Sequence, residues 1–539
     1  MCILLGALML MGALSGCGAE EEDAARQFVV RASVCGKVTS LDPAMNTDPS
    51  AETVFCALYE NLLRSSVDGE GNLTVEPGVA KEYEIVENYD GTVDYVFTLR
   101  SAARWSDGTR VRARDFDYAW RRHVDPATES PNHAMLSMVQ GYDAVRETGD
   151  AAKLGVKADG DTTFRVTLLN PCPYFLSDIC TAVPTMPLRS DASRKTEDWT
   201  TSTAALCNGP YQVGVWSKEE YMQLRRNPSY YESRMVTPDM LRFLFAPDPE
   251  EAWLYHEGGR LDYVAAPPER VEPTGQLSLR TVTCVLYNHM SDVFSDGQVR
   301  RAFDLSLDRA AVAAAAGKAM RPATGLVPHG VVGASIDADG DFRTVGGEKL
   351  AVDAEGYSMR CLEAETELRG AGYWGGVGYP TVTCLYVAGD EARAAASAAA
   401  GIWRERLNVA VTTEGVPREE FDRRIYAGEY DLAIDTLETA YGDAMDYLAP
   451  FAGTDGSNML HYVNKPYDLL IGVAGSSRDP AARTAFLHDA EELLLGDTAL
   501  SPLYFGGRSY VLNKDLTGVR HDLRGNAYFD AAVRIDTDE

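Results

Sequence analysis

Residues 97–122 read FTLRSAARWSDGTRVRARDFDYAWRR and carry the densest set of structural signals in the chain. Apolar and polar residues alternate through 93–100, and this period of two predicts a β-strand. Asp107-Gly108 is typical of a tight turn. Three aromatic side chains of the stretch are expected in a core rather than at a ligand: Trp105, Tyr118 and Trp120. We expect Arg100 and Asp115 to be solvated or to brace the structure, so the stretch predicts a fold and not a binding site.

The same mixture of signals continues on both sides of this stretch. The predicted strands are 28–32 and 163–169, and the predicted helices are 51–63, 299–316 and 391–407. Asn208-Gly209-Pro210 breaks the chain before a further patch at 211–213. Short strands that interleave with helices favour an α/β or mixed α+β class over an all-helical or all-β one.

Further short motifs accompany the opening stretch along most of the chain. They are LDP at 41–43, LYENLL at 58–63, DG at 68–69, EPGVA at 76–80, DPAT at 125–128, NGPY at 208–211, RNPSYY at 226–231, VRRAF at 299–303, DR at 308–309, AGY at 371–373 and YDL at 430–432. Each motif alone is weak. In this order, the motifs resemble the peptide/nickel class of extracellular solute-binding proteins (family 5), and most of all its oligopeptide-binding lipoproteins of ABC importers.

The resemblance implies a bilobal clamp of the periplasmic-binding-protein kind with an additional third domain, closing around its ligand by hinge motion. It also implies a division of the chain. Lobe I would be discontinuous and comprise 28–58, 197–292 and 502–539; the extra domain would be 59–196, and lobe II 293–501. Such a protein binds an oligopeptide or related solute and delivers it to an ABC permease, with no cofactor, and we expect a monomer.

Oligopeptide-binding members of the family enclose an extended peptide by main-chain pairing, with an Asp at its amine and basic groups at its carboxylate. This chain lacks the matching residues for both the amine end and the carboxylate end of the ligand. Ala440 stands where the amine-binding Asp is expected, and Ile434 and Ile425 stand at two Arg positions. Recognition of both charged ends is therefore predicted to be lost. Alternatively Asp443 or Asp446 replaces the Asp, or the ligand is end-blocked, longer than the cleft, or no peptide.

The resemblance also suggests which residues would contact the ligand. Thr436, Leu437 and Glu438 are the candidates for strand pairing, and Tyr441 is the candidate for stacking over the ligand. The first lobe would present Asn46, Thr47 and Asp48 opposite them. The remaining candidates are Arg418, Asp443 and Asp446.

The N-terminus carries a membrane-targeting signal. Residues 1–16 are uncharged and largely apolar, as in the core of a secretory signal peptide, and are too short to span a bilayer. LSGC at 14–17 then resembles a lipobox, which makes Cys17 the expected lipid anchor and 17–27 an acidic tether. Secretory signals open with Lys or Arg, and none precedes Cys17, so we expect translation to start upstream of Met1. The predicted location is outside the cytoplasmic membrane, with the lipid as the membrane contact.

Composition excludes some partners. The chain is 45% apolar and 24% charged, as is usual for globular proteins, and its 539 residues suffice for two or three lobes. A net charge of −30 argues against nucleic acid or anionic lipid as a partner.

The cysteines and one acidic segment raise the questions of a disulfide, a zinc site and a calcium site. Eight cysteines remain beyond Cys2 and Cys17, none in a CxxC pair, so a zinc site is not expected. Cys172 and Cys180 could form a disulfide, and buried free thiols are the equal alternative. Four acidic residues match ligand positions of an EF-hand calcium loop: Asp337, Asp339, Asp341 and Glu348. The position that needs glycine in such a loop holds Phe342. A solvated acidic loop is the preferred interpretation.

Two other functions compete with import. No nucleophile elbow, metalloprotease or phosphate-loop motif is present in the sequence, so an enzyme is not expected. A receptor that senses peptides without transporting them needs the same clamp, and the sequence does not separate the two.

Overall fold

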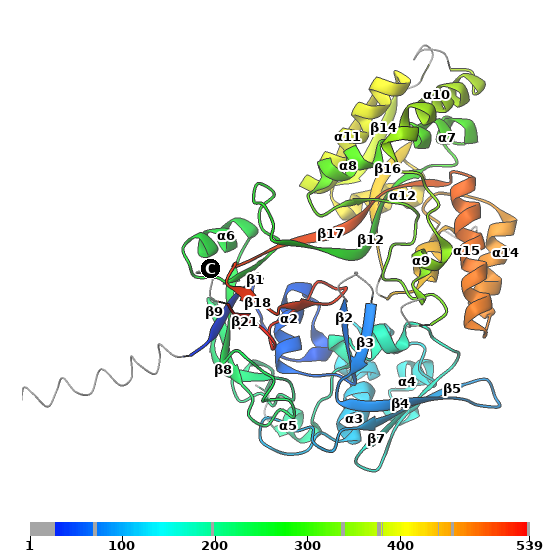
Figure 1. Cartoon of the computed structure of the whole chain (residues 1–539). Coiled ribbons are helices and arrows are strands. Elements are labelled where there is room, and N and C mark those ends of the chain that lie inside the picture. The colour runs from blue at the N-terminus through cyan, green and yellow to red at the C-terminus, as the bar shows by residue number, and fades with distance from the viewer. Residues whose placement is uncertain are drawn as a thin grey trace, which may run out of the picture.

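The computed structural model describes residues 27–67, 73–195, 199–335, 340–373, 379, 381–439, 441–453 and 458–535. These residues form two bodies that are joined by two long antiparallel strands, β12 (Gly275–Tyr287) and β17 (Leu500–Leu512) (Figure 1). We call the body before β12, with the C-terminal segment that follows β17, the lower body. The elements between β12 and β17 make the upper body. The chain is therefore bilobal, with mixed helices and strands as predicted.

One sheet runs through both bodies because β12 and β17 belong to each of them. Its strand order is β15-β14-β16-β12-β17-β11-β1-β10-β9-β8, with β13 (Arg321–Pro322) on β17. The upper-body strands are β14 (Val382–Val387), β15 (Val411–Val416) and β16 (Leu432–Glu438). The lower-body strands are β1 (Val29–Cys35), β8 (Tyr211–Ser217), β9 (Tyr221–Arg226), β10 (Met240–Ala246) and β11 (Tyr263–Ala265).

The lower body contains a second sheet of order β4-β5-β7-β6. Its strands are β4 (Ala80–Glu87), β5 (Val93–Leu99), β6 (Val156–Asp159) and β7 (Thr163–Leu168). Helix α3 (Ala113–Val124) packs against it and buries Trp120 and Phe116, while Trp105 is also fully buried. One hydrophobic cluster extends from this sheet to the core around β1, β10 and α2 (Pro49–Leu58), so the lower body packs as a unit.

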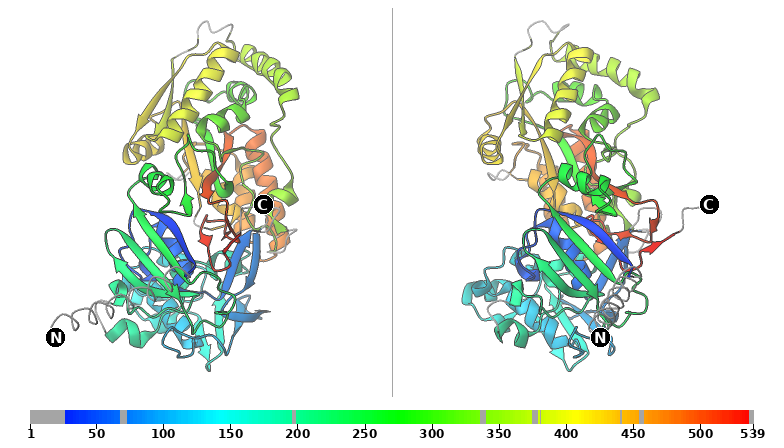
Figure 2. Two further views of the ribbon diagram at one scale, coloured as in Figure 1. Left: turned by 60° about the vertical axis from the view of Figure 1, so that its left-hand side comes forward. Right: turned by 90° about the vertical axis from the view of Figure 1, so that its left-hand side faces the viewer.

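Helices cover both faces of the sheet in the upper body (Figure 2). On one face lie α7 (Gly297–Leu305), α8 (Arg309–Ala316), α10 (Ala354–Gly370) and α11 (Asp390–Leu407). The other face is covered by α9 (Phe342–Gly346), α12 (Arg418–Ala427), α13 (Ala444–Leu448), α14 (Lys465–Ser476) and α15 (Pro480–Gly496). Alternate residues of β12 and β16 feed the two clusters, as the pleat of a strand requires.

The patterns of the opening stretch are confirmed. Strand β5 covers 93–99 with strictly alternating burial, and Gly108 adopts a positive φ of 83° in the turn. Asp115 is buried and braces the structure, because it accepts hydrogen bonds from Trp105 Nε1 (3.0 Å) and from the backbone N–H of Arg112 (2.9 Å). Tyr118 packs partly buried against the same core. The aromatic residues of the stretch are thus structural, as expected.

Two predicted helices are wrong in their extent. The helix predicted at 51–63 ends at Leu58, because the Asn208 side chain forms hydrogen bonds with the backbone N–H (3.2 Å) and C=O (2.8 Å) of Glu60. Those bonds hold Glu60 out of the helix. The helix predicted at 299–316 is two helices, α7 and α8, because the Asp308 side chain caps the second one at Ala311 N. The apolar periodicity of the sequence continues through both places. The helices are interrupted there by hydrogen bonds between side chains and the backbone, which the periodicity does not encode.

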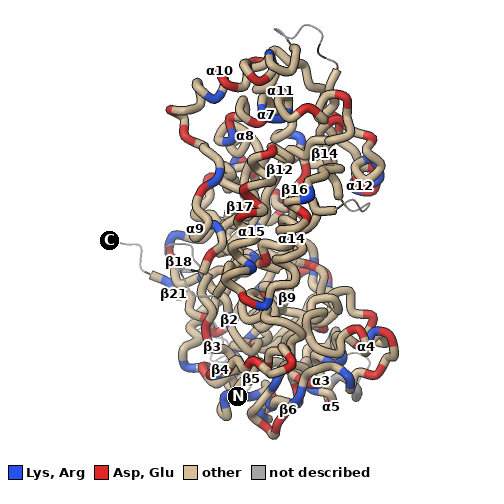
Figure 3. Tube along the Cα trace, turned by 90° about the vertical axis from the view of Figure 1, so that its right-hand side faces the viewer, with Lys and Arg blue, Asp and Glu red and all other residues tan. Residues whose placement is uncertain are grey.

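The remaining expectations concern cysteines and membrane contact. All eight cysteines between Cys35 and Cys384 are free, so the thiol alternative is confirmed over the disulfide. No helix in the described part of the chain is long and apolar enough to cross a membrane. Acidic and basic residues are interspersed along the trace in the view of Figure 3. The predicted signal peptide, Cys17 and most of the tether lie outside the described residues.

Candidate functional site

The junction between the two bodies lies where the pairing of β12 with β17 is interrupted. The register shifts between Ser278 and Val282 and again between Thr283 and Cys284. Such interruptions bend a strand locally. Two strands that cross at a bend can act as a hinge, so this junction is where a clamp would open and close.

Strand β16 ends beside this junction with one edge open. Its last residues, Thr436, Leu437 and Glu438, pair with Thr283, Val282 and Thr281 of β12. On the other edge, β14 pairs only as far as Ile434. Among the described strands, nothing pairs with that edge of 436–438. An exposed strand edge offers main-chain donors and acceptors to an extended ligand.

The chain after β16 packs against the lower body. Tyr441 stacks on Tyr174, with ring centroids 5.4 Å apart and an interplanar angle of 14°. A Cβ atom at Gly442 would lie 2.0 Å from Arg280 Nη1, so a larger residue here would have to displace this guanidinium. Arg280 forms an ion pair with the fully buried Asp178 of the lower body. The residues that follow β16 are therefore held by contacts that cross between the bodies.

Asp178 is the centre of these crossing contacts. Its carboxylate accepts hydrogen bonds from Arg280 and from Ser177 Oγ (2.8 Å), and its backbone carbonyl accepts one from Arg524 Nη2 (2.7 Å). Burial opposes ionisation, but Arg280 and Arg524 outweigh it and lower the pKa of Asp178. Asp178 is thus a charged link between the lower body, β12 and the C-terminal segment.

Asp443 and Asp446, the two candidates for a replacement carboxylate, have different surroundings. Asp443 caps α13 by accepting from Met445 N (3.1 Å) and forms two hydrogen bonds with Arg483, of 3.0 and 2.7 Å. The backbone N–H of Asp446 donates to the carbonyl of Asp443 (3.1 Å), but its side chain has no hydrogen bond or ion pair with any residue in the described ranges. Burial and the nearby charges of Asp443 and Asp178 raise the pKa of Asp446 to about 7, although Arg483 opposes the shift. Of these two described residues, Asp446 is the one whose carboxylate has no partner.

The first-lobe candidates lie in the turn before α2. Asp48 caps this helix by accepting from Ser50 N (2.9 Å), and the Asn46 side chain donates to the carbonyl of Asp48 (3.2 Å). Asn132 of the lower body donates to the carbonyl of Asn46 (2.7 Å), while Thr47 is exposed. The side chains of Asn46 and Asp48 thus hold the turn, which leaves Thr47 as the exposed member of the three.

The remaining candidates have structural partners of their own. Arg418 forms two hydrogen bonds with Asp435, of 3.0 and 2.8 Å, and one with Asp422 (3.1 Å). Ile434 and Ile425 are buried in the two upper-body clusters, so those positions face apolar cores. Ala440 lies outside the described residues.

The sequence did not predict several residues around Tyr441. Tyr174 stacks on it, and the phenol of Tyr142, which is paired with His133 Nδ1 at 2.6 Å, lies close enough to influence the pKa of Tyr441. Asp178 and Arg280 complete the set. Near Tyr174 and Asp178, the sequence pointed to Cys172 and Cys180 as a disulfide candidate and to no ligand contact.

The described residues contain no cluster of three or more metal-ligating side chains. Two of the four EF-hand-like positions, Asp337 and Asp339, lie outside the described ranges. Asp341 is used as the cap of α9 and accepts from Thr344 N (2.8 Å) and Gly330 N (2.6 Å), and Glu348 is exposed. The Asp341 carboxylate therefore stabilises the start of α9 through hydrogen bonds to backbone N–H groups.

Two bodies joined by a pair of strands, with an open strand edge at the junction, define a bilobal solute-binding protein. The family described as "Bacterial extracellular solute-binding proteins, family 5 Middle" matches residues 74–459, which is more than half of the chain. The chain belongs to this family.

Curated relatives cover nearly the whole chain. The periplasmic oligopeptide-binding protein OppA of Escherichia coli (strain K12) is 29% identical over 486 residues, which are 87% of this chain and 85% of OppA. The probable deoxycholate-binding periplasmic protein YgiS of the same strain is 28% identical over 481 residues, covering 86% of each chain. The names of the two relatives thus describe different ligands.

Solved structures show the same fold. The unliganded open form of the murein tripeptide binding protein MppA superposes with a TM-score of 0.80 at 22% identity, covering 94% of this chain and 98% of MppA. Haemophilus influenzae OppA in complex with the peptide RPPGFSPFR superposes with a TM-score of 0.66 at 24% identity. The match covers 95% of this chain and 99% of that OppA. Both solved structures thus share the fold of this chain.

Proposed function

We propose that this protein is an extracytoplasmic lipoprotein that binds an oligopeptide or related solute and delivers it to an ABC importer. The observation that carries the proposal is the open edge of β16 at 436–438, at the junction of the two bodies and shortly before Asp446, whose side chain has no partner among the described residues. Relatives named as oligopeptide-binding and dipeptide-binding proteins support it. Binding rather than catalysis is the proposed activity, and turnover of peptides by the purified protein would contradict it.

The clamp would close about the bend in β12 and β17. In the proposed division, lobe I is 28–58, 197–292 and 502–539, the extra domain is 59–196 and lobe II is 293–501. Thr436, Leu437 and Glu438 would pair with the main chain of the ligand. Thr47, with the turn that Asn46 and Asp48 hold, would face them across the cleft when the bodies approach.

Asp446 is the proposed receptor for a cationic group of the ligand. A half-buried carboxylate without a partner is unfavourable in the free protein, because burial penalises its charge. An ammonium group would remove that penalty, and Tyr441 and Tyr174 beside it offer aromatic rings to a cation. Asp443 does not compete for this role, because Arg483 already neutralises it.

Asp446→Asn tests this role. We expect the variant to lose affinity for a free-amine peptide by about 10- to 100-fold, which is at or below the low end of the range of about 2–5 kcal/mol for a fully buried charge pair because Asp446 is only half-buried. Wild type should prefer that peptide over its N-acetylated form by a similar factor, and the variant should not discriminate. Isothermal titration calorimetry measures each affinity, on a peptide first recovered from the purified protein by native mass spectrometry.

The outcomes of that titration separate two failures. If wild type binds no peptide, the proposed function is wrong. If wild type binds free and acetylated peptides equally well, peptide binding stands but the role of Asp446 does not. Arg418→Gln is the matched control, because Arg418 is committed to Asp435 and Asp422, and we expect its affinity for the peptide to change less than 3-fold.

The pH dependence has a defined sign. An ammonium ligand needs ionised Asp446, whose pKa in the free protein is about 7. Affinity should therefore fall by up to about 10-fold per pH unit below 7, and should also fall above about 8, where a peptide amine loses its proton. In Asp446→Asn the acidic limb of this bell-shaped profile should disappear. Calorimetry between pH 5 and 9 gives the profile.

The proposed anchor is Cys17, in the lipobox-like sequence LSGC. Cys17→Ala should move the protein from the membrane fraction to the soluble extracytoplasmic fraction, because the lipid is the proposed membrane contact. Fractionation with immunoblotting measures this, and a membrane-bound variant would contradict the anchor.

Deleting the protein should also abolish uptake of a labelled ligand, whereas unchanged uptake would favour a sensing receptor.

A further inference from the structure

An open groove lies in the lower body at the carboxyl ends of β1 and β10, which are parallel neighbours in the sheet. It is bounded by the residues that follow these strands, by the turn between β8 and β9, and by α6 (Pro249–Glu257). Helix α6 packs against β1, β10 and β11 (Figure 1). The volume of the groove is about 790 Å³, which is within the range of sites for small molecules.

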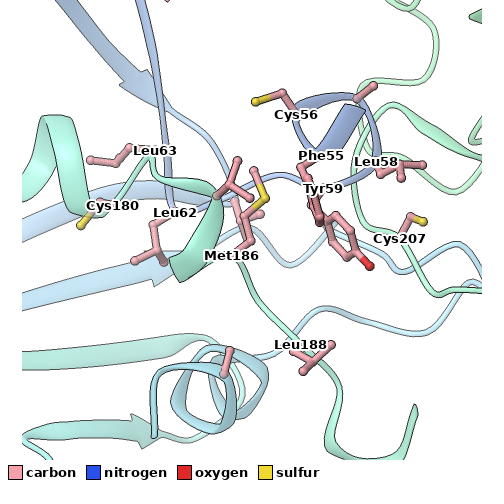
Figure 4. Packing of buried hydrophobic residues seen from close by; sticks show 14 of the residues in the cluster. Phe55, Cys56, Leu58, Tyr59, Leu62, Leu63, Cys180, Met186, Leu188 and Cys207 are labelled. Atoms are coloured by element: carbon pink, nitrogen blue, oxygen red, sulfur yellow. The ribbon is translucent and has the colours of Figure 1, made fainter. Parts of the chain in front are cut away.

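The connections that leave β1 and β10 diverge at this groove. The chain passes from β1 to α2, which packs in the hydrophobic cluster of which Phe55 and Leu58 are drawn in Figure 4. It passes from β10 to α6 on the opposite face of the sheet, because Leu244 of β10 shares a cluster with Ala252 of α6, whereas Phe243 belongs to the cluster of α2. Parallel strands with diverging connections leave a crevice at their carboxyl ends, and ligands of open α/β sheets bind in such crevices.

Two arginines lie side by side on the sheet face that forms the floor of the groove. Arg31 of β1 and Arg242 of β10 are directly opposite each other in the register of the two strands, and like charges in such positions repel. Arg31 has a counter-charge on its other side, where it pairs with Asp262 (3.1 Å). Asp262 also pairs with Arg534 (2.9 Å), so its single charge is shared between two guanidinium groups. The charge of Arg242 is therefore not offset by this carboxylate.

Arg242 and Arg260 form no ion pair with any carboxylate in the described part of the chain. Arg242 donates through Nε (3.2 Å) and Nη2 (2.7 Å) to the neutral Gln223 Oε1, and its Cζ lies 4.7 Å from the centre of the Tyr221 ring. Arg260 Cζ lies 4.1 Å from the centre of the Tyr255 ring. A guanidinium that stacks on a ring keeps the N–H groups at its edge available for an acceptor. Both arginines are thus positioned donors without a counter-charge.

The acidic residues of the lining have other surroundings. Glu219 pairs with Lys37 (2.6 Å), Glu251 accepts from the hydroxyl of Tyr255, and Glu220 is exposed. The lining contains four cationic and three acidic side chains. In a chain with a net charge of −30, this makes the groove locally positive.

We propose that this groove binds a small solute through an oxyanion, which is a carboxylate or a phosphate group. Arg242 and Arg260 would donate to the oxygens of the anion, as guanidinium groups do in bidentate pairs. Arg31 connects the two, because it is opposite Arg242 and donates to the carbonyl of Gly259 (2.9 Å), the residue before Arg260. The bound anion would relieve the repulsion between Arg31 and Arg242, and Leu244 would contact an apolar part of the solute.

Isothermal titration calorimetry of the full chain with inorganic phosphate and with succinate tests the site. At constant ionic strength, we expect saturable binding of one anion per chain for at least one probe, and the probe that binds tells phosphate from carboxylate. Arg242→Gln should weaken that binding by about 10-fold or more, the effect of removing a hydrogen bond to a charged group. Wild type that binds neither probe saturably overturns the proposal.

A second variant and a control accompany the titration. Arg260→Gln should weaken binding by about 3-fold or more, and the exposed position of Arg260 makes this variant safe for folding, which circular dichroism verifies. Arg234→Gln removes an exposed arginine outside the lining and should leave the affinity within 2-fold of wild type. Equal affinities of wild type, Arg242→Gln and Arg260→Gln would also overturn the proposal. Peptide affinity should be unchanged in Arg242→Gln, because no residue of this lining is among the proposed peptide contacts.

Discussion

Replacing Glu491 with alanine is expected to destabilise the upper body by about 3–5 kcal/mol, the cost of removing one partner of a buried ion pair. Glu491 lies on α15 with no exposed surface, and its carboxylate forms an ion pair with the buried Arg343 of α9. The same carboxylate accepts from the backbone N–H groups of Leu326 (2.9 Å) and Val327 (3.0 Å). One side chain therefore neutralises a charge and satisfies two buried donors.

The alanine variant leaves the two backbone N–H groups without a partner and Arg343 without its counter-charge, because the other hydrogen bond of Arg343 is to the carbonyl of Gly347 (3.0 Å). The variant therefore buries a guanidinium charge that nothing neutralises. Urea denaturation followed by circular dichroism measures the loss. Glu492→Ala is a matched control at the next position, because Glu492 pairs with Lys349 at the surface (3.1 Å), and exposed pairs contribute about 0–1 kcal/mol. Equal effects of the two variants would contradict this account of Glu491.

Asp178→Ala is expected to have the second largest effect, again about 3–5 kcal/mol, because it leaves the buried Arg280 without its partner. It should also weaken ligand binding. Gly442 rests directly on Arg280, so a displaced Arg280 side chain removes the support of the residues between β16 and Asp446. Denaturation measures the stability and calorimetry measures the affinity.

The pH dependence separates this variant from a general packing defect. The pKa of Asp178 is lowered in the folded protein, so its stabilising contribution is present above the ordinary aspartate value of about 4 and is lost as pH falls through the folded pKa. The stability difference between wild type and Asp178→Ala should therefore shrink in strong acid. Asp161→Ala, which breaks the exposed pair with Arg112, should change stability by less than about 1 kcal/mol. A difference that is constant with pH would contradict the electrostatic account.

Local patterns predicted the parts of the fold that local forces decide. Strand β5 was predicted because alternation in its sequence matches alternation in its burial, and α11 because its alanine-rich period is long. The helices that ended early were limited by contacts that periodicity does not encode. In α2 the limiting contact comes from Asn208, which is 148 residues away from Glu60.

The candidate site was predicted in part for the same reason. The family resemblance pointed to 436–446 as candidates, but the partners that distinguish Asp443 from Asp446 come from elsewhere in the chain. Arg483 is 40 residues beyond Asp443, and Arg280 is 102 residues beyond Asp178. No local pattern marks such pairs, because each member looks like an ordinary surface charge until the chain is folded.

The return of the C-terminal segment to the lower body has a consequence for the order of folding. Strand β17 lies between β12 and β11 in the sheet, and residues 516–532 contribute to the same core as residues 30–245. A chain that emerges from its N-terminus therefore presents the first half of this core long before the last piece is available. Because contacts of such high sequence separation form slowly, the unfinished lower body should depend on chaperones or on a delay in collapse until residue 532 has emerged.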